Sequence, residues 1–251
     1  MLSTRYQKID TLSVQDIARM YELFAAHYAY SPFDTFLSDL HKKDGAFIVR
    51  QRSTQQIVGF STLGIYHFQL GGRQAKGLFS GDTILEQAYR GSRSLQGAFA
   101  RKLLWEAVKA PLTPQYWLLI SKGYKTFLLM ARNFPDYYPR RGKSQPEMEA
   151  LVSEYCEALF PGKLDSARMV LDFGDNANCL HDHVAAISDA ERQDPDIAFF
   201  ERRNPSWQRG TELPCIARAD LYAFARLIVP FLGKVLRGRS RARQAPAASI
   251  A

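Results

Sequence analysis

The stretch from Leu78 to Val108 constrains the fold more than any other part of this 251-residue sequence. It begins with the β-prone run "LFSGDTIL" and continues through the polar turn "EQAYRGSRS". It ends in "LQGAFARKLLWEAV", whose apolar residues recur at helical spacing. A helix entered from such a turn points its unpaired N–H groups and its positive dipole end back at the turn. The stretch therefore predicts a strand, a turn suited to bind phosphate, and a helix.

The segments on either side predict a mixed α/β (α+β) fold. Helical patterns cover residues 13–28 and 32–45, and apolar runs at 46–50, 57–68 and 75–85 predict a three-stranded antiparallel meander. A buried strand at 115–121 and a helix at 124–134 follow, which predicts a parallel pair beside the turn. Beyond residue 140 we expect helices at 146–160 and from Asp194 and Pro195 onward, with Arg168–Phe173 and Leu213–Ala217 closing the sheet.

The predicted architecture is a mostly antiparallel central sheet flanked by helices, with a helical C-terminal elaboration. Residues 1–140 would form the core, residues 141–236 the elaboration with its closing strands, and residues 237–251 a basic tail. The net charge is +8, and much of the excess lies in that tail. Such a tail is either a solvated end or a contact for nucleic acid, anionic lipid or an acidic carrier protein. No reader motif for nucleic acid accompanies it, so no nucleic-acid partner is predicted.

Cysteine usage and the chain ends indicate a cytoplasmic protein. The first residues carry no apolar core of the signal-peptide type, and the three cysteines, Cys156, Cys179 and Cys215, form no CxxC pair. "CLHDH" groups Cys179 with His181 and His183, but no fourth ligand stands at a recognisable spacing, so no metal site is predicted. "LYAFARLIVPFLGKVL" is too short and interrupted to span a bilayer, which leaves a packing helix or an interfacial anchor.

The turn "YRGSRSL", together with the order of the elements, resembles the GNAT acyltransferase superfamily. Tyr89, Arg90 and Gly91 match the start of that family's pyrophosphate turn, whereas Arg93 and Leu95 replace its later small residues. Either Arg90 and Arg93 hold phosphate by charge, or Gly97 and Ala98 shift the turn along the chain. The resemblance implies a thioester donor with its pantetheine beside a splayed central strand. The residues predicted to bind this donor are Ile84, Leu85, Tyr89, Arg90, Gly91, Arg93, Gln96, Gly97, Ser121 and Lys122.

Acyl transfer to an amine needs a group that takes the ammonium proton. Asp82, inside an apolar run, is the predicted base, because burial raises the pKa of a carboxyl group toward useful values. Glu86 is a second candidate. The resemblance implies a tyrosine acid after the fifth strand, but Leu129 or Met130 stands there. Tyr124, Tyr137 and Tyr138 lie nearby in sequence at other places, and Tyr138 is the candidate among them.

The sequence thus predicts an N-acyltransferase that moves an acyl group from acyl-CoA or an acyl carrier protein to a small-molecule amine, without a metal. Two alternatives stay open. One is a non-catalytic acyl-binding or membrane-docking protein with a degenerate turn, and the other is an enzyme resembling acyl-homoserine-lactone synthases. The aromatic content, 16 Phe and 12 Tyr, favours a long or bulky acyl group over acetyl.

Overall fold

A computed structural model describes residues 1–28, 32–70, 73–174 and 187–226. The strands are β1 (Leu2–Lys8), β2 (Gly45–Gln51), β3 (Ile57–Leu70), β4 (Arg73–Leu85), β5 (Gln115–Ser121), β6 (Tyr137–Tyr138), β7 (Leu164–Asp165), β8 (Val170–Leu171) and β9 (Leu213–Arg218). The α-helices are α1 (Val14–Ala25), α2 (Phe33–His41), α3 (Ser94–Lys109), α4 (Tyr124–Asn133), α5 (Pro146–Leu159) and α7 (Pro195–Arg203).

The predicted fold class is confirmed. Seven strands form one sheet in the order β1-β2-β3-β4-β5-β9-β6, in which only the β4–β5 pair is parallel. This is the arrangement of helices, meander, turn and crossover that the resemblance to the GNAT superfamily implied. Two predicted helix starts are also present, since Ser13 accepts a bond from the backbone N–H of Asp16, and Asp194 accepts one from that of Asp196.

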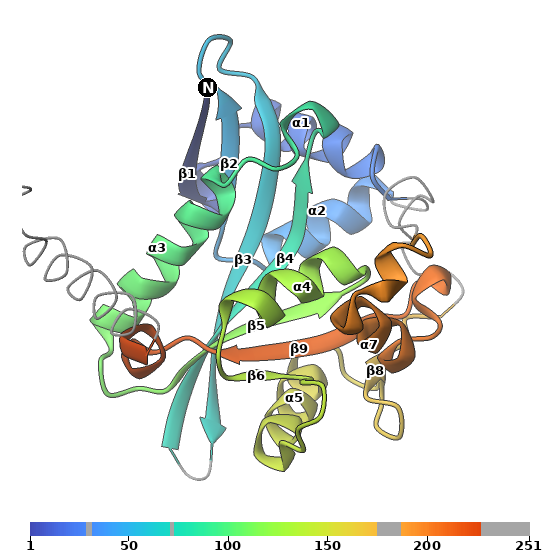
Figure 1. Ribbon diagram of the computed structural model, residues 1–251. Coiled ribbons are helices and arrows are strands. Elements are labelled where there is room, and N and C mark those ends of the chain that lie inside the picture. Colours follow the sequence, from blue (N-terminus) through green and yellow to red (C-terminus); the bar gives the residue numbers. More distant parts are fainter. Residues whose placement is uncertain (29–31, 71–72, 175–186, 227–251) are drawn as a thin grey trace, which may run out of the picture.

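Helices cover both faces of the sheet (Figure 1). On one face, α3, α4 and α7 pack on side chains that include Leu78 of β4 and Trp117 of β5. On the other face, α1 and α2 cover the first strands, and α5 covers the β5-β9-β6 end, where Phe79 is buried. The two faces alternate along β4 as the pleat of a strand requires. Asp82 lies on the second of these faces, between α1–α2 and α5.

Buried charges tie β4 to α3. The ammonium group of Lys76 donates to the Glu106 backbone carbonyl at 2.7 Å and to its carboxylate at 3.2 Å. Lys102 and Lys109 donate to the other carboxylate oxygen at 3.0 and 3.1 Å. Burial alone would raise the pKa of Glu106, but these hydrogen bonds from three lysines lower it to about 2. The ion pair between Lys76 and Glu106 therefore holds α3 against β4, the strand that carries Asp82.

Two sequence predictions are corrected here. The predicted order lacked the strand β1. The strand expected at Arg168–Phe173 reaches the main sheet only through one isolated bridge, from Leu171 to Glu212 just before β9, and β8 otherwise pairs with β7 in a two-stranded sheet. The short strand β6 pairs instead with β9 at the sheet edge, and β9 occupies the position predicted for Leu213–Ala217.

Several predictions concern residues outside the described ranges, namely the basic tail at 237–251 and the group Cys179, His181 and His183. Within the described ranges, no helix combines the length and apolar character needed to cross a bilayer.

Candidate functional site

The two central strands separate where the candidate base lies. β4 pairs with β5 only from Lys76 to Ser80, opposite Gln115 to Leu119. Beyond that point β4 continues to Leu85 and, within the described part of the chain, pairs with β3 alone, while Ile120 and Ser121 pair with β9. The segments 81–85 and 120–123 therefore border an opening between two strands of the same sheet.

The backbone of β4 offers free hydrogen-bonding groups to this opening. Glu86 donates its backbone N–H to the carbonyl of Val58 at 2.9 Å, in register with the β3–β4 pairing. Because bonded and non-bonded pairs alternate along an antiparallel ladder, the amide groups of Ile84 face β3, whereas those of Thr83 and Leu85 face the opening. An extended ligand amide could pair with this edge as an added strand does.

A β-bulge sets the direction of Asp82. Gly81 and Asp82 together oppose Thr62 of β3, so β4 holds one extra residue between Ser80 and Thr83. A Cβ atom on Gly81 would lie 2.3 Å from Thr62 Oγ1, so the bulge has no room for a side chain there. After the bulge, Asp82 and Ile84 lie on the face covered by α1 and α2, where Ile84 is buried.

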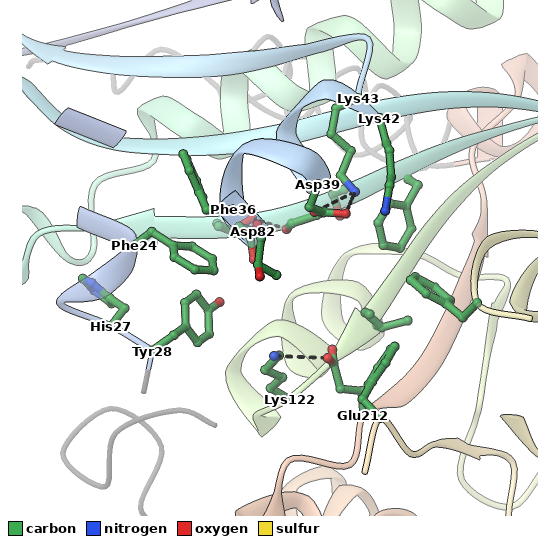
Figure 2. Close-up of a pocket in the computed structure, with 18 of the residues that line it drawn as sticks. Phe24, His27, Tyr28, Phe36, Asp39, Lys42, Lys43, Asp82, Lys122 and Glu212 are labelled. Carbon is green, nitrogen blue, oxygen red and sulfur yellow. Dashed lines mark hydrogen bonds and ion pairs between the residues drawn. The ribbon is translucent and has the colours of Figure 1, made fainter. Parts of the chain in front are cut away.

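Asp82 lies between two ion pairs, with the Tyr28 hydroxyl pointing toward it (Figure 2). Lys43 pairs with Asp39 at 3.0 Å on one side, and Lys122 pairs with Glu212 at 3.2 Å on the other. Burial and the negative charge of Asp39 raise the pKa of Asp82 to about 6, although Lys122 and Lys43 oppose the rise. No ion pair is formed by Asp82 itself among the described residues. Its carboxyl group can therefore exchange a proton near neutral pH.

The same surroundings perturb two neighbouring groups. Burial, followed by the charges of Asp82 and Glu212, raises the pKa of Tyr28 well above its ordinary value. Burial also raises the pKa of Glu212, with Lys122 acting in the opposite direction. Lys122 lies 5.0 Å from the centre of the Tyr28 ring. The hydroxyl of Tyr28 is thus protonated at neutral pH beside a titratable carboxyl group.

Asp82 faces a cleft of about 1180 Å³. Its floor is made by Ser80–Thr83 of β4 and by Ile120 and residues 122–126 after the splay, and α1, α2 and the end of α5 supply the walls. Charged side chains line it at and after the end of α2, and Phe160 and Phe173 line it at the α5 side, while Phe24, Tyr28 and Phe36 add aromatic side chains beside α1 and α2. The volume lies at or above the upper end of typical small-molecule sites, which are about 300–1,000 Å³. The cleft can hold two reactants at once.

Three features of the turn before α3 bear on its predicted role in binding phosphate. Gly91 adopts φ of +93°, a left-handed conformation that favours glycine. Arg90 and Arg93 are exposed, and Arg93, the N-cap residue of α3, makes no side-chain cap. Leu95 is turned into the core, so it does not crowd the turn as its position in the motif suggested. The turn thus presents two guanidinium groups beside the N-terminus of α3, where the Ser94 backbone N–H donates to Ser92 Oγ at 3.3 Å.

The other predicted donor-binding residues are placed as follows. Tyr89 packs partly buried against the core of the α3 face, Gln96 is exposed, and a Cβ on Gly97 would meet only Arg101, at 3.6 Å. Lys122 lines the cleft. The hydroxyl of Ser121 donates to the carbonyl of Gly123 and is buried away from the cleft.

Two predicted catalytic residues are not brought to Asp82. Glu86 forms an ion pair with Arg19 of α1 at 2.5 Å. Tyr138 is buried on β6, where its hydroxyl donates to Glu149 at 3.0 Å and accepts from Arg203 at 3.1 Å. Neither residue lines the cleft. The structure therefore gives no geometric support to Glu86 as a base or to Tyr138 as an acid.

Sequence reasoning missed four residues around Asp82: Tyr28, Asp39, Lys43 and Glu212. They come from three parts of the chain: Tyr28 follows α1, Asp39 and Lys43 lie at and just after the end of α2, and Glu212 directly precedes β9. Glu212 alone carried a signal, since it directly precedes an apolar strand, as Asp82 lies within one. These residues come together around Asp82 only because the fold brings distant segments of the chain side by side.

Cysteine chemistry has no support in the described part of the chain. Burial raises the pKa of Cys156 to about 12 and that of Cys215 well above its ordinary value. Both thiols are therefore protonated at neutral pH. Among the described residues, no group of three His, Cys, Asp or Glu side chains is placed to hold a metal ion.

Neither a scan against protein-family profiles nor a search of curated proteins finds a match to this sequence. Solved structures do align with it. One is a protein of unknown function from Enterococcus faecalis described as a probable N-acyltransferase, at 13% identity and a TM-score of 0.41 over 54% of this chain and 33% of that chain. Another is an acetyltransferase from Trypanosoma brucei, at 16% identity and a TM-score of 0.37 over 58% of this chain and 96% of that one.

A GNAT family N-acetyltransferase from Escherichia coli, solved in complex with CoA, aligns at 9% identity and a TM-score of 0.35 over 49% of this chain and 64% of that one. The matched part of this chain thus spans a third of the first of these proteins. The three structures are described as a probable N-acyltransferase, an acetyltransferase and a GNAT family N-acetyltransferase. At these identities and TM-scores the likeness says nothing of activity.

Proposed function

We propose that this protein is an N-acyltransferase. It would take an acyl group from acyl-CoA, or from the phosphopantetheine of an acyl carrier protein, and transfer it to the amine of a small molecule. The observation that carries the proposal is the carboxyl group of Asp82, which lies at the point where β4 leaves β5 and has its pKa raised to about 6. A base therefore lies beside the opening between β4 and β5, which suits an extended pantetheine arm.

The donor fits the elements around the splay. The amide groups of Thr83 and Leu85 would pair with the pantetheine amides along the open edge of β4. Arg90, Arg93 and the backbone N–H groups at the N-terminus of α3 would bind the phosphates, because guanidinium groups and helix N–H groups both favour anions. The thioester carbonyl would then lie near Asp82. A carrier protein would offer the same arm with a single phosphate.

The reaction is a direct attack in a ternary complex. Asp82 accepts a proton from the acceptor ammonium group, and the freed amine nitrogen attacks the thioester carbonyl carbon. The C–N bond forms and the C–S bond breaks, so that the thiolate leaves. The second proton lost by the nitrogen ends on that thiolate, and the protonated hydroxyl of Tyr28, which points toward Asp82 in Figure 2, is the candidate that delivers it. The products are an amide and a free thiol.

The test has two parts. Native mass spectrometry and calorimetry on the full chain should detect binding of acyl-CoA, and a thiol-release assay with a panel of amines should show turnover that depends on the amine. Binding without turnover for any amine would favour the non-catalytic alternative. The absence of binding by both acyl-CoA and acyl-phosphopantetheine would refute the proposal.

A further inference from the structure

The α5 side of the cleft is an aromatic wall formed by Tyr66, Phe79, Phe160 and Phe173. The ring centres of Tyr66 and Phe79 are 6.5 Å apart, those of Phe79 and Phe160 are 5.7 Å apart, and those of Phe160 and Phe173 are 5.6 Å apart. The four rings thus form a continuous chain of contacts. All four line the cleft that contains Asp82.

Part of this wall is apolar surface that is only partly buried among the described residues. Phe79 is only 3% exposed, but Tyr66, Phe160 and Phe173 are partly buried at the edge of the α5 core. Ile120 and Leu159 line the cleft beside them and are also partly buried. Contiguous apolar surface inside a cleft is the usual signature of a binding site for an apolar group.

The wall begins where a donor bound in the splay would deliver its acyl group. A pantetheine arm that follows Thr83 and Leu85 toward Ser80 reaches the point where β4 and β5 pair again. On the α3–α4 face this point is closed, because Trp117 Nε1 donates to Ser80 Oγ at 2.8 Å in a buried hydrogen bond. The acyl group must therefore leave on the opposite face, and the ring of Phe79, next to Ser80, is on that face.

The charged side of the cleft suits the acceptor instead. Asp39, Lys43, Lys122 and Glu212 are held in ion pairs around Asp82, and an alkyl chain laid over them would remove them from water without compensation. Phe79 marks the boundary between the two sides, since the Lys43 ammonium group lies 5.4 Å from the centre of its ring. The two reactants would thus approach Asp82 from different sides.

We infer that the acyl group is longer than acetyl and binds along the aromatic wall from Phe79 to Phe160 and Phe173. The inference rests on the proposed function and adds the class of donor to it. An acetyl group would reach no farther than Phe79 and leave the rest of the wall uncovered. Each methylene buried on the wall is expected to tighten binding roughly three- to fourfold, so octanoyl-CoA should bind more than about 100-fold more tightly than acetyl-CoA.

The experiment is a calorimetric titration of the full chain with acetyl-, butyryl-, octanoyl- and dodecanoyl-CoA. A parallel series of acyl-phosphopantetheines keeps the acyl chain and lacks the nucleotide, so it separates wall binding from recognition of the CoA head group and mimics the carrier-protein donor. Affinity should rise with chain length in both series. Equal affinities across the lengths would overturn the inference and leave the proposed function standing, whereas no binding in either series would remove the proposed function as well.

Variants locate the effect on the wall. Phe160→Ala and Phe173→Ala should each weaken octanoyl-CoA binding about tenfold and leave acetyl-CoA binding within about twofold. Phe33→Ala is the matched control, because Phe33 is 41% exposed on α2 and does not line the cleft. Ile120→Trp fills the cleft without removing a ring, so it should abolish the preference for long chains even if an alanine variant fails to fold. A length preference that survives Ile120→Trp would place the chain elsewhere and overturn the inference.

Discussion

Asp82→Asn should make the protein inactive and more stable at the same time. The change keeps the size of the side chain and removes the proton acceptor, so turnover should fall by about 10²–10⁴-fold with little loss of donor affinity. Both neighbouring lysines keep their partners, Lys43 with Asp39 and Lys122 with Glu212, so the substitution strands no charge. The usual penalty for breaking a buried ion pair is therefore absent.

The gain in stability follows from the pKa of Asp82. Folding raises this pKa from about 3.8 to about 6, which corresponds to roughly 2 to 3 kcal/mol of unfavourable free energy when the group is ionised. The unfolded chain loses its proton near pH 4 and the folded chain near pH 6, so this cost is absent below pH 4 and fully present above pH 6. The asparagine variant has no such cost. The difference in unfolding free energy should thus grow from near zero at pH 4 to roughly 2 to 3 kcal/mol at pH 7.

Urea denaturation of both proteins at pH 4, 5, 6 and 7 measures this difference directly. The same samples give donor affinity by calorimetry and steady-state rates by thiol release. A variant less stable than the wild type at pH 7 would show that Asp82 has a stabilising partner and would refute the reasoning from burial. A variant with full activity would remove Asp82 from the reaction.

Four further predictions follow from the geometry. The wild-type kcat/KM should rise as the pH is raised through about 6, because Asp82 must be ionised to accept a proton, and a profile flat from pH 5 to 8 would contradict this. Replacing Arg90 and Arg93 together by Ala should weaken acyl-CoA binding by about 2 to 4 kcal/mol in calorimetry, with exposed Arg73→Ala as the control that leaves it unchanged. Gly81→Ala should lower the free energy of unfolding by about 1 to 3 kcal/mol, because its Cβ would lie 2.3 Å from Thr62 Oγ1, and Thr62→Ala in the same chain should restore part of the loss. Glu106→Gln should cost about 3 kcal/mol because Lys76 loses its buried partner, whereas the half-exposed Lys109→Ala should cost less than about 1 kcal/mol; equal losses in denaturation curves would contradict the central role of the buried pair.

The sequence predicted the parts of this fold that depend on local pattern. The strand, turn and helix from Leu78 to Val108 are present because apolar periodicity and turn residues act over a few positions. β1 was missed because Leu2–Lys8 shows no clean alternation, and all of its side chains are only partly buried or exposed. The prediction of a closing strand at Arg168–Phe173 was wrong for the opposite reason. The apolar pattern of a strand is present there, but β8 pairs with the nearby strand β7.

The residues of the candidate site also divide into one that the sequence could predict and several that it could not. Asp82 could be singled out from sequence because an acid inside an apolar strand is costly without a purpose. Its neighbours could not, because Tyr28, Asp39 and Glu212 are brought together by tertiary packing of segments far apart in the chain. Tyr138 was chosen for its nearness in sequence to α4, and it lies instead at the edge strand β6, bonded to Glu149 and Arg203.

The bulge at Gly81 changes which alternate side chains of β4 face the α5 side of the sheet. Up to Ser80 the odd-numbered side chains, such as Phe79, face the α5 side, and after the extra residue the even-numbered ones, Asp82 and Ile84, do so. In an unbulged strand Asp82 would follow Ser80 onto the α3–α4 face, into the apolar core around Trp117. Deletion of Gly81 would instead restore a regular ladder, in which Asp82 directly follows Ser80 and opposes Thr62, so its side chain would stay on the α5 side. The bulge therefore lets β4 carry Gly81 and still direct Asp82 toward the cleft and Ile84 toward α1 and α2. A one-residue deletion at this place should leave the faces of these side chains unchanged, whereas one between Thr83 and Leu85 would reverse the faces of the side chains that follow it.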